Sequence, residues 1–233
     1  MTVGAVLTAA GSGRRFGAPV PKALVPLAGR ALVVHAALAL EQTAAVQQLV
    51  VTAPQAHLPA IESAVSAACS IPVTVVAGGP TRQASVAAGL KALSGCEVVL
   101  VHDAARPLAS VGLMQELIDQ VQQGHEAVVP GVPVTDTVKE VDDAHPPRAV
   151  RTVERTSLRA IQTPQAFRSE TLRRVHADGA QLAGQEASAI SDDAGLAERC
   201  GITVRVIEGE PRAMKITTPH DLALAELFAT EER

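Results

Sequence analysis

Residues 3–16 read VGAVLTAAGSGRRF, an uncharged apolar run followed by a loop of small residues and two arginines. An apolar run without charge is typical of a strand that is covered on both faces, as in a parallel sheet. The small residues of the loop would let backbone N–H groups approach and bind a polyphosphate. The loop does not match a Walker A motif, and Phe16 stands where a dinucleotide fingerprint needs its third glycine. The alternative interpretation is an ordinary glycine-rich turn with solvated arginines.

Short apolar runs alternate with helix-like segments over residues 3–130, an order typical of an α/β fold with a doubly wound, mostly parallel sheet. In such sheets ligands bind beyond the carboxyl ends of the strands. The small-residue loop, Gly78-Gly79 and Asp103 each follow an expected strand, so we expect them at one edge of the sheet. The expected strands are Val3–Leu7, Leu49–Thr52, Val73–Val76, Val98–His102 and Ala127–Val129, and the expected helices are Leu32–Gln42, Pro59–Ala68, Arg82–Leu93 and Leu113–Gln122.

Residues 133–155 break this alternation, with two strand-like runs around a polar tip that contains prolines. This pattern predicts a protruding β-hairpin arm. Because a lone hairpin is at best marginally stable in water, we expect the arm to pack on another surface. The alternative is a surface excursion lying on its own domain. We expect residues 1–233 to form one domain that includes this arm.

The segments after the arm continue the same alternation. We expect helices at Ser169–Ala177 and Asp193–Arg199, a strand at Ile202–Ile207 and a last helix at Leu222–Phe228. Thr218 is expected to cap that last helix, with Pro219 in its first turn.

The composition argues against several classes of partner. A net charge of −4 does not suit a nucleic-acid surface, and a chain with three Phe and no Trp or Tyr lacks a platform for stacking bases. The three cysteines are widely separated without CxxC spacing, which favours reduced thiols in a cytoplasmic protein over disulfides or a zinc site. Neither a signal peptide nor an apolar stretch of about 18 residues is present, so we expect no membrane contact.

Several blocks of sequence carry a resemblance to a known family. Residues 9–15 with Pro21-Lys22 resemble the signature of nucleotidyltransferases that activate sugar phosphates. Further blocks, in the same order and over nearly the whole chain, resemble the 2-C-methyl-D-erythritol 4-phosphate cytidylyltransferase family of the non-mevalonate isoprenoid pathway. These blocks are Gly78-Gly79, Arg82–Val86, His102–Pro107, Asp136–Lys139, Thr152–Arg155, Thr163–Gln165 and Met214–Thr217.

The resemblance implies a Rossmann-like nucleotidyltransferase fold and transfer of CMP from CTP to 2-C-methyl-D-erythritol 4-phosphate. The products are 4-diphosphocytidyl-2-C-methyl-D-erythritol and pyrophosphate. Because a phosphomonoester has its second pKa near 6, the attacking phosphate is already largely deprotonated at neutral pH and needs no general base. The site must instead bring two polyanions together and stabilise their charge.

The resemblance also assigns residues to this chemistry. It implies that Arg15 and Lys22 contact the triphosphate and that Lys215 lies near the reacting phosphates. Asp103 is implied as the ligand of Mg²⁺, which can be held by one carboxylate together with substrate phosphates, although an Asp at this place could also cap a turn. Arg106 is implied near the substrate phosphate. The nucleotide is expected to lie against Ala9, Ala10, Gly11, Gly13, Gly79, Ser85 and Ala104.

A homodimer formed through the arm is also implied, with Thr137, Arg155 and Thr163 binding methylerythritol phosphate from across the interface. Arg155 can grip a phosphate through two parallel N–H bonds. Pro80 departs from the acidic residue that the family often has there, and proline has no N–H to offer the base. Thr8 at the family's usual proline position is a milder departure.

Other functions compete with this one. A ribitol 5-phosphate cytidylyltransferase shares the loop, the aspartate block and much of the arm. A nucleotidyltransferase acting on a hexose 1-phosphate is a further alternative, although no second domain is evident. A non-catalytic nucleotide-binding regulatory subunit is an alternative of another class, against which the intact Lys22, Asp103 and Lys215 argue.

Overall fold

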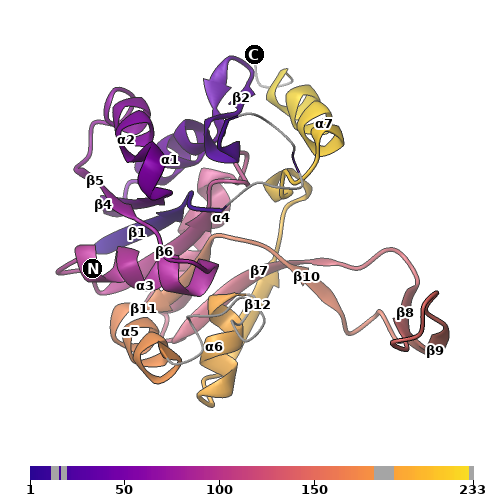
Figure 1. Ribbon diagram of the computed structural model, residues 1–233. Coiled ribbons are helices and arrows are strands. Elements are labelled where there is room, and N and C mark those ends of the chain that lie inside the picture. Colours follow the sequence, from indigo (N-terminus) through magenta and orange to yellow (C-terminus); the bar gives the residue numbers. More distant parts are fainter. Residues whose placement is uncertain (12–15, 17–19, 181–191, 231–233) are drawn as a thin grey trace.

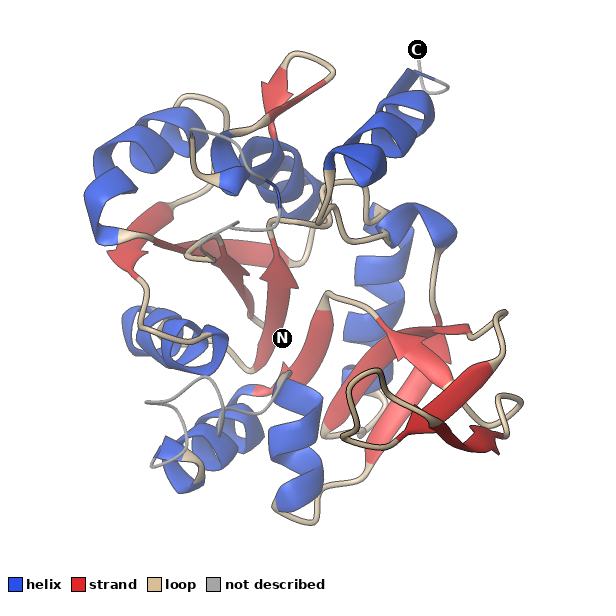
Figure 2. Ribbon diagram, turned by 45° about the vertical axis from the view of Figure 1, so that its right-hand side comes forward, coloured by secondary structure: helices blue, strands red, loops and turns tan. Residues whose placement is uncertain are grey.

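The computed structural model describes residues 1–11, 16, 20–180 and 192–230. Its centre is a sheet of eight strands with helices on both faces (Figure 1, Figure 2). The strands are β1 (Val3–Thr8), β4 (Val46–Ala53), β5 (Val73–Ala77), β6 (Val98–Asp103), β7 (Ala127–Pro133), β10 (Arg159–Ile161), β11 (Gln165–Arg168) and β12 (Val204–Glu208). The helices are α1 (Leu32–Gln42), α2 (Leu58–Ser66), α3 (Arg82–Ala92), α4 (Val111–Gln122), α5 (Ser169–Asp178), α6 (Asp193–Arg199) and α7 (Pro219–Thr230).

The strand order is β10-β7-β11-β6-β1-β4-β5, and β12 pairs with β7. β1 lies between β4 and β6, parallel to both, and β5 continues the parallel part beyond β4. Such an order, with helical crossovers, is that of a doubly wound sheet. The predicted α/β fold class is therefore confirmed.

Two layers of helices bury the sheet. Val3, Ala5 and Leu7 of β1 pack in one core with α1, α2 and α4, whereas Val6 packs in a second core with α3, α5 and α6. Side chains alternate between the two faces of a strand, so a strand covered on both sides must be apolar throughout. This explains the uncharged run at the start of the chain.

The sheet contains an antiparallel insertion that the sequence did not predict. β11 lies between β6 and β7 and runs antiparallel to both, while β10 pairs antiparallel with the last residues of β7, on the edge opposite β12. In this register Gln165 pairs with Val101, near the carboxyl end of β6. The residues just before β11 are thereby brought to the edge where β6 ends.

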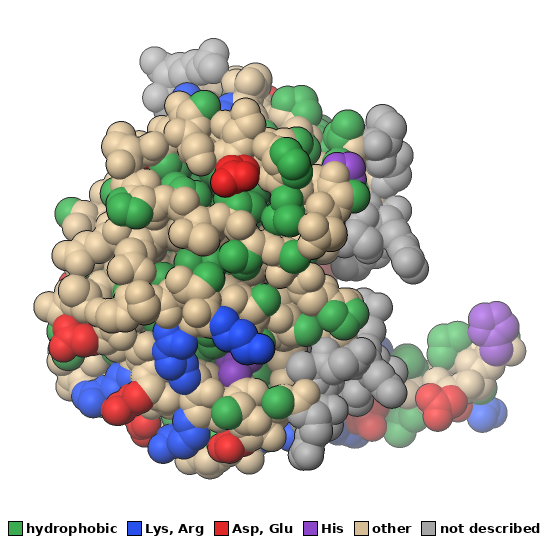
Figure 3. All heavy atoms as spheres, turned by 60° about the vertical axis from the view of Figure 1, so that its left-hand side comes forward, with side chains coloured by type: hydrophobic (Ala, Val, Ile, Leu, Met, Phe, Trp, Pro, Cys, Tyr) green, Lys and Arg blue, Asp and Glu red, His purple; other side chains and the backbone are tan. Residues whose placement is uncertain are grey.

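The predicted arm is confirmed as a hairpin of β8 (Val138–Val141) and β9 (Ala149–Val153), which pair antiparallel. It stands away from the body of the molecule (Figure 1, Figure 3). Val141 and Val150 on this hairpin are 52% and 61% exposed. What covers the arm in solution stays a prediction.

The last helix, α7, closes one side of the molecule against the short hairpin of β2 (Pro26–Leu27) and β3 (Arg30–Ala31). Its start is capped as predicted, because the Asp221 N–H donates to Thr218 Oγ1 and the Thr218 N–H donates to Asp221 Oδ2. Its Ala225 packs in a small core with Leu27 and Ile216, so the segment just before α7 is fixed near the N-terminal part of the chain. Of the helices that the structure describes, none is long and apolar enough to cross a membrane.

Candidate active site

A cavity of about 550 Å³ lies at the carboxyl ends of β1, β5 and β6. Its walls come from the small-residue loop after β1, the turn between β5 and α3, the end of β6 and two lysines from distant parts of the chain. It brings together most of the expected site residues, namely Ala9, Ala10, Gly11, Lys22, Gly79, Ser85, Asp103, Ala104 and Lys215. Gly13 and Arg15 lie outside the described residues.

The turn between β5 and α3 packs tightly, and this packing requires its glycines. A Cβ on Gly78 would lie 2.4 Å from the Ala10 Cβ, and one on Gly79 would lie 2.4 Å from the Ala84 Cβ. Ser85 ties this turn together, since its Oγ accepts from the Gly79 N–H (3.1 Å) and donates to the Thr81 carbonyl (2.8 Å). Glycine at these two positions thus allows the loops to form one wall.

Helix α3 begins at this same wall. Thr81 caps it, with its Oγ1 accepting from the Ala84 N–H at 3.0 Å. Thr81, Arg82 and Ser85 all line the cavity. Because a helix N-terminus carries partial positive charge, this end of α3 favours an anionic ligand in the cavity.

Asp103, the last residue of β6, is the central charged group. Its Oδ1 accepts from Arg82 Nε at 3.0 Å and from Thr8 Oγ1 at 3.1 Å, while its Oδ2 accepts from Lys215 Nζ at 2.7 Å. Burial alone would raise the pKa of this carboxyl, but Arg82 and Lys215 outweigh burial and hold the pKa well below its usual range. Asp103 is therefore ionised, and Thr8, a departure from the family pattern, supports it directly.

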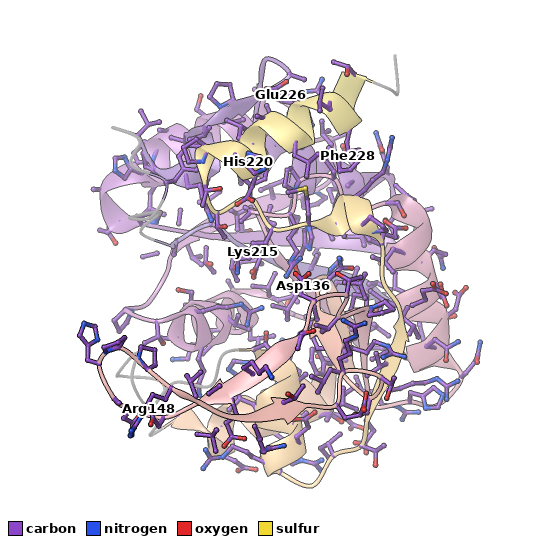
Figure 4. All side chains as sticks on the ribbon, turned by 90° about the vertical axis from the view of Figure 1, so that its right-hand side faces the viewer. Asp136, Arg148, Lys215, His220, Glu226 and Phe228 are labelled. Carbon is purple, nitrogen blue, oxygen red and sulfur yellow. The ribbon has the colours of Figure 1, made fainter. Side chains whose placement is uncertain are left out.

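The two lysines of the site come from opposite ends of the chain. Lys22 begins the short helix η2 (Lys22–Leu24), and its Nζ donates to the Ile216 carbonyl at 3.0 Å. The Ile216 N–H in turn donates to the Ala105 carbonyl at 2.8 Å, just after β6. These bonds place Lys215 beside Asp103, and Lys215 lies below the start of α7 in Figure 4.

Arg82 is a site residue that the sequence did not single out. Its Nε contacts Asp103, and its Nη1 contacts Asp193 at 2.6 Å. Burial opposes the charge of this guanidinium, but the two carboxylates raise its pKa above the ordinary value. A signal was present, because Arg82 opens the helix that follows the Gly78-Gly79 turn, at the edge where the site was expected.

A second cavity, of about 370 Å³, adjoins the first and shares Arg82, Asp103 and Lys215 with it. Thr163 lines it, and its Oγ1 accepts from the Asp103 N–H at 3.0 Å. The expectation that Thr163 acts from across a dimer interface is therefore wrong. The antiparallel insertion of β11 beside β6 places Thr163 in the site of its own chain.

His102 lies behind this cavity and holds it together. Its Nδ1 is 3.0 Å from Thr163 Oγ1 and its Nε2 is 3.1 Å from the Arg106 carbonyl. Burial lowers the pKa of His102 to about 4, so the ring is neutral at physiological pH. Since a carbonyl can only accept, Nε2 carries the proton and Nδ1 accepts from the Thr163 hydroxyl.

Arg106 also lines the second cavity, but its guanidinium binds backbone. Nη1 donates to the Ala213 carbonyl at 2.7 Å and Nη2 donates to the Ile161 carbonyl at 3.3 Å. Arg106 therefore joins the segment before Lys215 to the strand before Thr163. Its expected contact with a substrate phosphate stays a prediction.

Thr137 and Arg155 lie on the exposed arm, and neither lines either of the cavities described above. Arg155 Nη1 donates to the Thr135 carbonyl at the base of the arm. Their expected role at a partner's site stays a prediction.

Comparisons with known proteins agree on one family. The family model described as IspD, 2-C-methyl-D-erythritol 4-phosphate cytidylyltransferase, matches residues 3–231. A protein of that name from Saccharopolyspora erythraea is 43% identical over 97% of this chain and 98% of its own length. Another, from Rhodococcus opacus, is 44% identical over 97% of this chain and 95% of its own length.

Solved structures lead to the same family. A crystal structure of 2-C-methyl-D-erythritol 4-phosphate cytidylyltransferase from Thermus thermophilus is similar with a TM-score of 0.79 and 35% identity, covering 99% of this chain and 100% of that one. A 4-diphosphocytidyl-2C-methyl-D-erythritol synthase from Anaerococcus prevotii has a TM-score of 0.83 and 28% identity, with 98% of each chain covered.

Proposed function

Because this chain belongs to the 2-C-methyl-D-erythritol 4-phosphate cytidylyltransferase family, we propose that it transfers CMP from CTP to 2-C-methyl-D-erythritol 4-phosphate. The reaction gives 4-diphosphocytidyl-2-C-methyl-D-erythritol and pyrophosphate in the non-mevalonate route to isoprenoids. The observation that carries the proposal is the single cavity that joins a small-residue loop to Lys22, Lys215 and Asp103.

In this reaction a phosphate oxygen of the acceptor attacks the α-phosphorus of CTP, and the bond to the departing pyrophosphate breaks. The attacking phosphate is largely deprotonated at neutral pH, so no side chain has to remove a proton. The chain's task is to hold two anions in line and to stabilise the charge on the transferred and departing groups. Fixed cations in a partly buried site suit this task, because they need no reorganisation during the reaction.

The two lysines divide this work. We assign Lys22, whose Nζ donates to the Ile216 carbonyl, to support of the departing pyrophosphate. Arg15, which lies outside the described residues, is expected to share this role. We assign Lys215, which contacts Asp103, to the reacting phosphates. The second cavity, which reaches Thr163 and Arg106, has room for the acceptor next to them.

We assign the turn between β5 and α3 to binding of the base. Cytosine carries an amino donor at position four, so the site must offer it an acceptor. The Gly79 N–H and the Ser85 hydroxyl are already bonded to each other, and Pro80 has no N–H. We therefore expect backbone carbonyls of this turn to select cytosine.

The donors at Asp103 fit a magnesium ion. In the part of the chain that the structure describes, no group of three or more His, Cys, Asp or Glu side chains could hold a metal by itself. Mg²⁺ does not need such a cage, because it is commonly held by one or two carboxylates together with substrate phosphates and water. When bound with CTP at Asp103, the ion would neutralise phosphate charge. Lys215 and Arg82 compensate the same carboxylate in the ligand-free chain.

We also propose that two copies of the chain form a dimer through the arm, with Thr137 and Arg155 of one copy at the site of the other. A hairpin that stands clear of its own body and exposes Val141 and Val150 supports this proposal. Two strands alone are marginally stable in water, so a partner surface would stabilise them. A cytoplasmic location stays a prediction.

A substrate panel tests the activity. We expect pyrophosphate release from CTP with 2-C-methyl-D-erythritol 4-phosphate, and far slower release with ATP, GTP or UTP. The same panel with ribitol 5-phosphate and a hexose 1-phosphate separates the competing transferases. Absence of pyrophosphate release with every acceptor would overturn the proposal in favour of a nucleotide-binding subunit.

A further inference from the structure

A continuous series of buried polar contacts runs from the site to helices α6 and α5. Arg82 Nε contacts Asp103 Oδ1 at 3.0 Å, and Arg82 Nη1 contacts Asp193 Oδ2 at 2.6 Å. Asp193 Oδ1 in turn lies 2.8 Å from His176 Nε2. This series of contacts therefore connects β6, α3, α6 and α5, which are far apart in sequence. None of the chemistry proposed above uses Asp193 or His176.

We propose that Asp193 is a positioning residue for cytidylyl transfer, and that it acts through Arg82 on the orientation of Asp103. This inference rests on the proposed function. Among the described residues, the Asp193 side chain has hydrogen bonds with Arg82 and His176 and with none of the residues expected at CTP or the acceptor, and it is only 1% exposed. Its influence on the reaction must therefore pass through the guanidinium of Arg82.

The shape of the guanidinium supplies the physical reason. Its five donors lie in one rigid plane, so two contacts on different edges fix its orientation. Here Asp193 holds Nη1, which leaves Nε for one oxygen of Asp103. The other oxygen of Asp103 remains with Lys215, at the cavity.

Without the charge of Asp193, a different pairing becomes favourable. A guanidinium and a carboxylate prefer two parallel hydrogen bonds when nothing else holds either group. Arg82 would then turn toward Asp103 and engage both of its oxygens. Such a pair would displace Lys215 and withdraw the carboxylate from the ligands of the cavity.

The surroundings of Asp193 fix it for this role. Its neighbour Asp192 caps α6, with Oδ1 accepting from the Gly195 N–H at 3.1 Å and Oδ2 accepting from Gln165 Nε2 at 2.8 Å. Asp193 is therefore left to face α3 and α5. Because a carboxylate only accepts, His176 donates to it through Nε2.

The test compares Asp193→Asn with a matched control. Asn keeps the shape of the side chain but removes its charge. Glu126→Gln makes the same chemical change at a carboxylate that also contacts α5, through Thr171 Oγ1 at 2.7 Å, away from the site. We expect Asp193→Asn to lower kcat at least tenfold while the KM for CTP changes less than threefold, and Glu126→Gln to leave kcat within twofold of wild type.

A double-mutant cycle separates positioning from general damage. Arg82→Lys keeps a positive charge but lacks the planar guanidinium, so it cannot fix one contact with Asp193 and one with Asp103 in a single rigid plane. If Asp193 acts through Arg82, the double variant loses no more kcat than the worse single variant. Losses that multiply, or a folded Asp193→Asn protein with kcat within twofold of wild type, would overturn the inference.

A crystal structure of ligand-free Asp193→Asn gives a readout that needs no activity. We expect Arg82 to pair with both oxygens of Asp103 in this variant. An unchanged contact between Arg82 Nε and one oxygen of Asp103 would refute the positioning role. Because this result does not depend on pyrophosphate release, it stays informative even if the substrate panel refutes the proposed function.

Discussion

Replacing Asp103 with Asn changes the site at its centre without changing its shape. The carboxylate lies between Arg82 at 3.0 Å and Lys215 at 2.7 Å, so the variant leaves two cations facing an uncharged amide. Removing one donor that stabilises an anionic transition state costs about 2.7–4 kcal/mol, and loss of the proposed magnesium ligand should cost a similar amount. We therefore expect kcat to fall at least about a hundredfold, measured as pyrophosphate release at saturating CTP, acceptor and magnesium.

The same variant should unfold more easily, but by a limited amount. Removing one partner of a buried ion pair costs about 3–5 kcal/mol when the other is left alone. Here Arg82 keeps Asp193, and the Lys215 side chain is 39% exposed to solvent. We expect a loss of about 1–3 kcal/mol in urea unfolding, below the full cost of an unpaired charge.

Binding of CTP separates a chemical role of Asp103 from a structural one. Removing a negative charge reduces repulsion of the triphosphate, so CTP binding without magnesium should not weaken, as calorimetry would show. A folded variant with kcat within tenfold of wild type would refute the reasoning. So would CTP binding that weakens tenfold without magnesium.

Three further predictions follow from the structure. Mixed dimers of Arg155→Ala and Lys22→Ala chains should regain activity if the arm completes the partner's site. One of the two sites in such a dimer carries both intact residues. Activity no higher than that of the two parent dimers would contradict this prediction. Gly79→Ala should raise the KM for CTP and cost about 1–3 kcal/mol of stability, since the new Cβ would lie 2.4 Å from the Ala84 Cβ; a wild-type KM with unchanged melting temperature would count against the tight turn. The pKa of His102 is about 4 in the folded chain, against an ordinary 6.5. Between these two pH values the unfolded chain binds more protons than the folded chain. Acidification across this range therefore lowers the free energy of unfolding by about 3 kcal/mol. His102→Gln should remove that part of the pH dependence, and urea unfolding at pH 7 and pH 4.5 checks it against wild type; an equal loss in both proteins would show that another group is responsible.

The parallel half of the sheet was predictable because its strands are apolar runs covered on both faces. The predicted strand at Val98–His102, for example, differs from β6 by one residue. Periodicity likewise located α1 and α6, whose bounds match the predicted ones. Burial by two helical layers leaves a clear pattern of apolar residues in the sequence, and this pattern was sufficient to predict the parallel strands and these helices.

The short antiparallel strands were not predictable in this way. β10 and β11 have three and four residues, too few for a period to be recognised, and they form only because β6 and β7 offer their edges. Thr163 was consequently expected at a partner's site, although it lines a cavity of its own chain. Arg82 stands in one of the blocks that carry the resemblance but was given no role, because its partner Asp193 follows 111 positions later and no local pattern links the two.

The bond between Lys22 and the Ile216 carbonyl joins residues 194 positions apart. A ribosome makes the nucleotide loop long before the second lysine, so a growing chain carries an unfinished site until Lys215 has been added. A fragment that ends before Lys215 would lack this cation, whatever else it had folded. Competence to consume nucleotide therefore depends on a segment that is made after every strand of the central sheet.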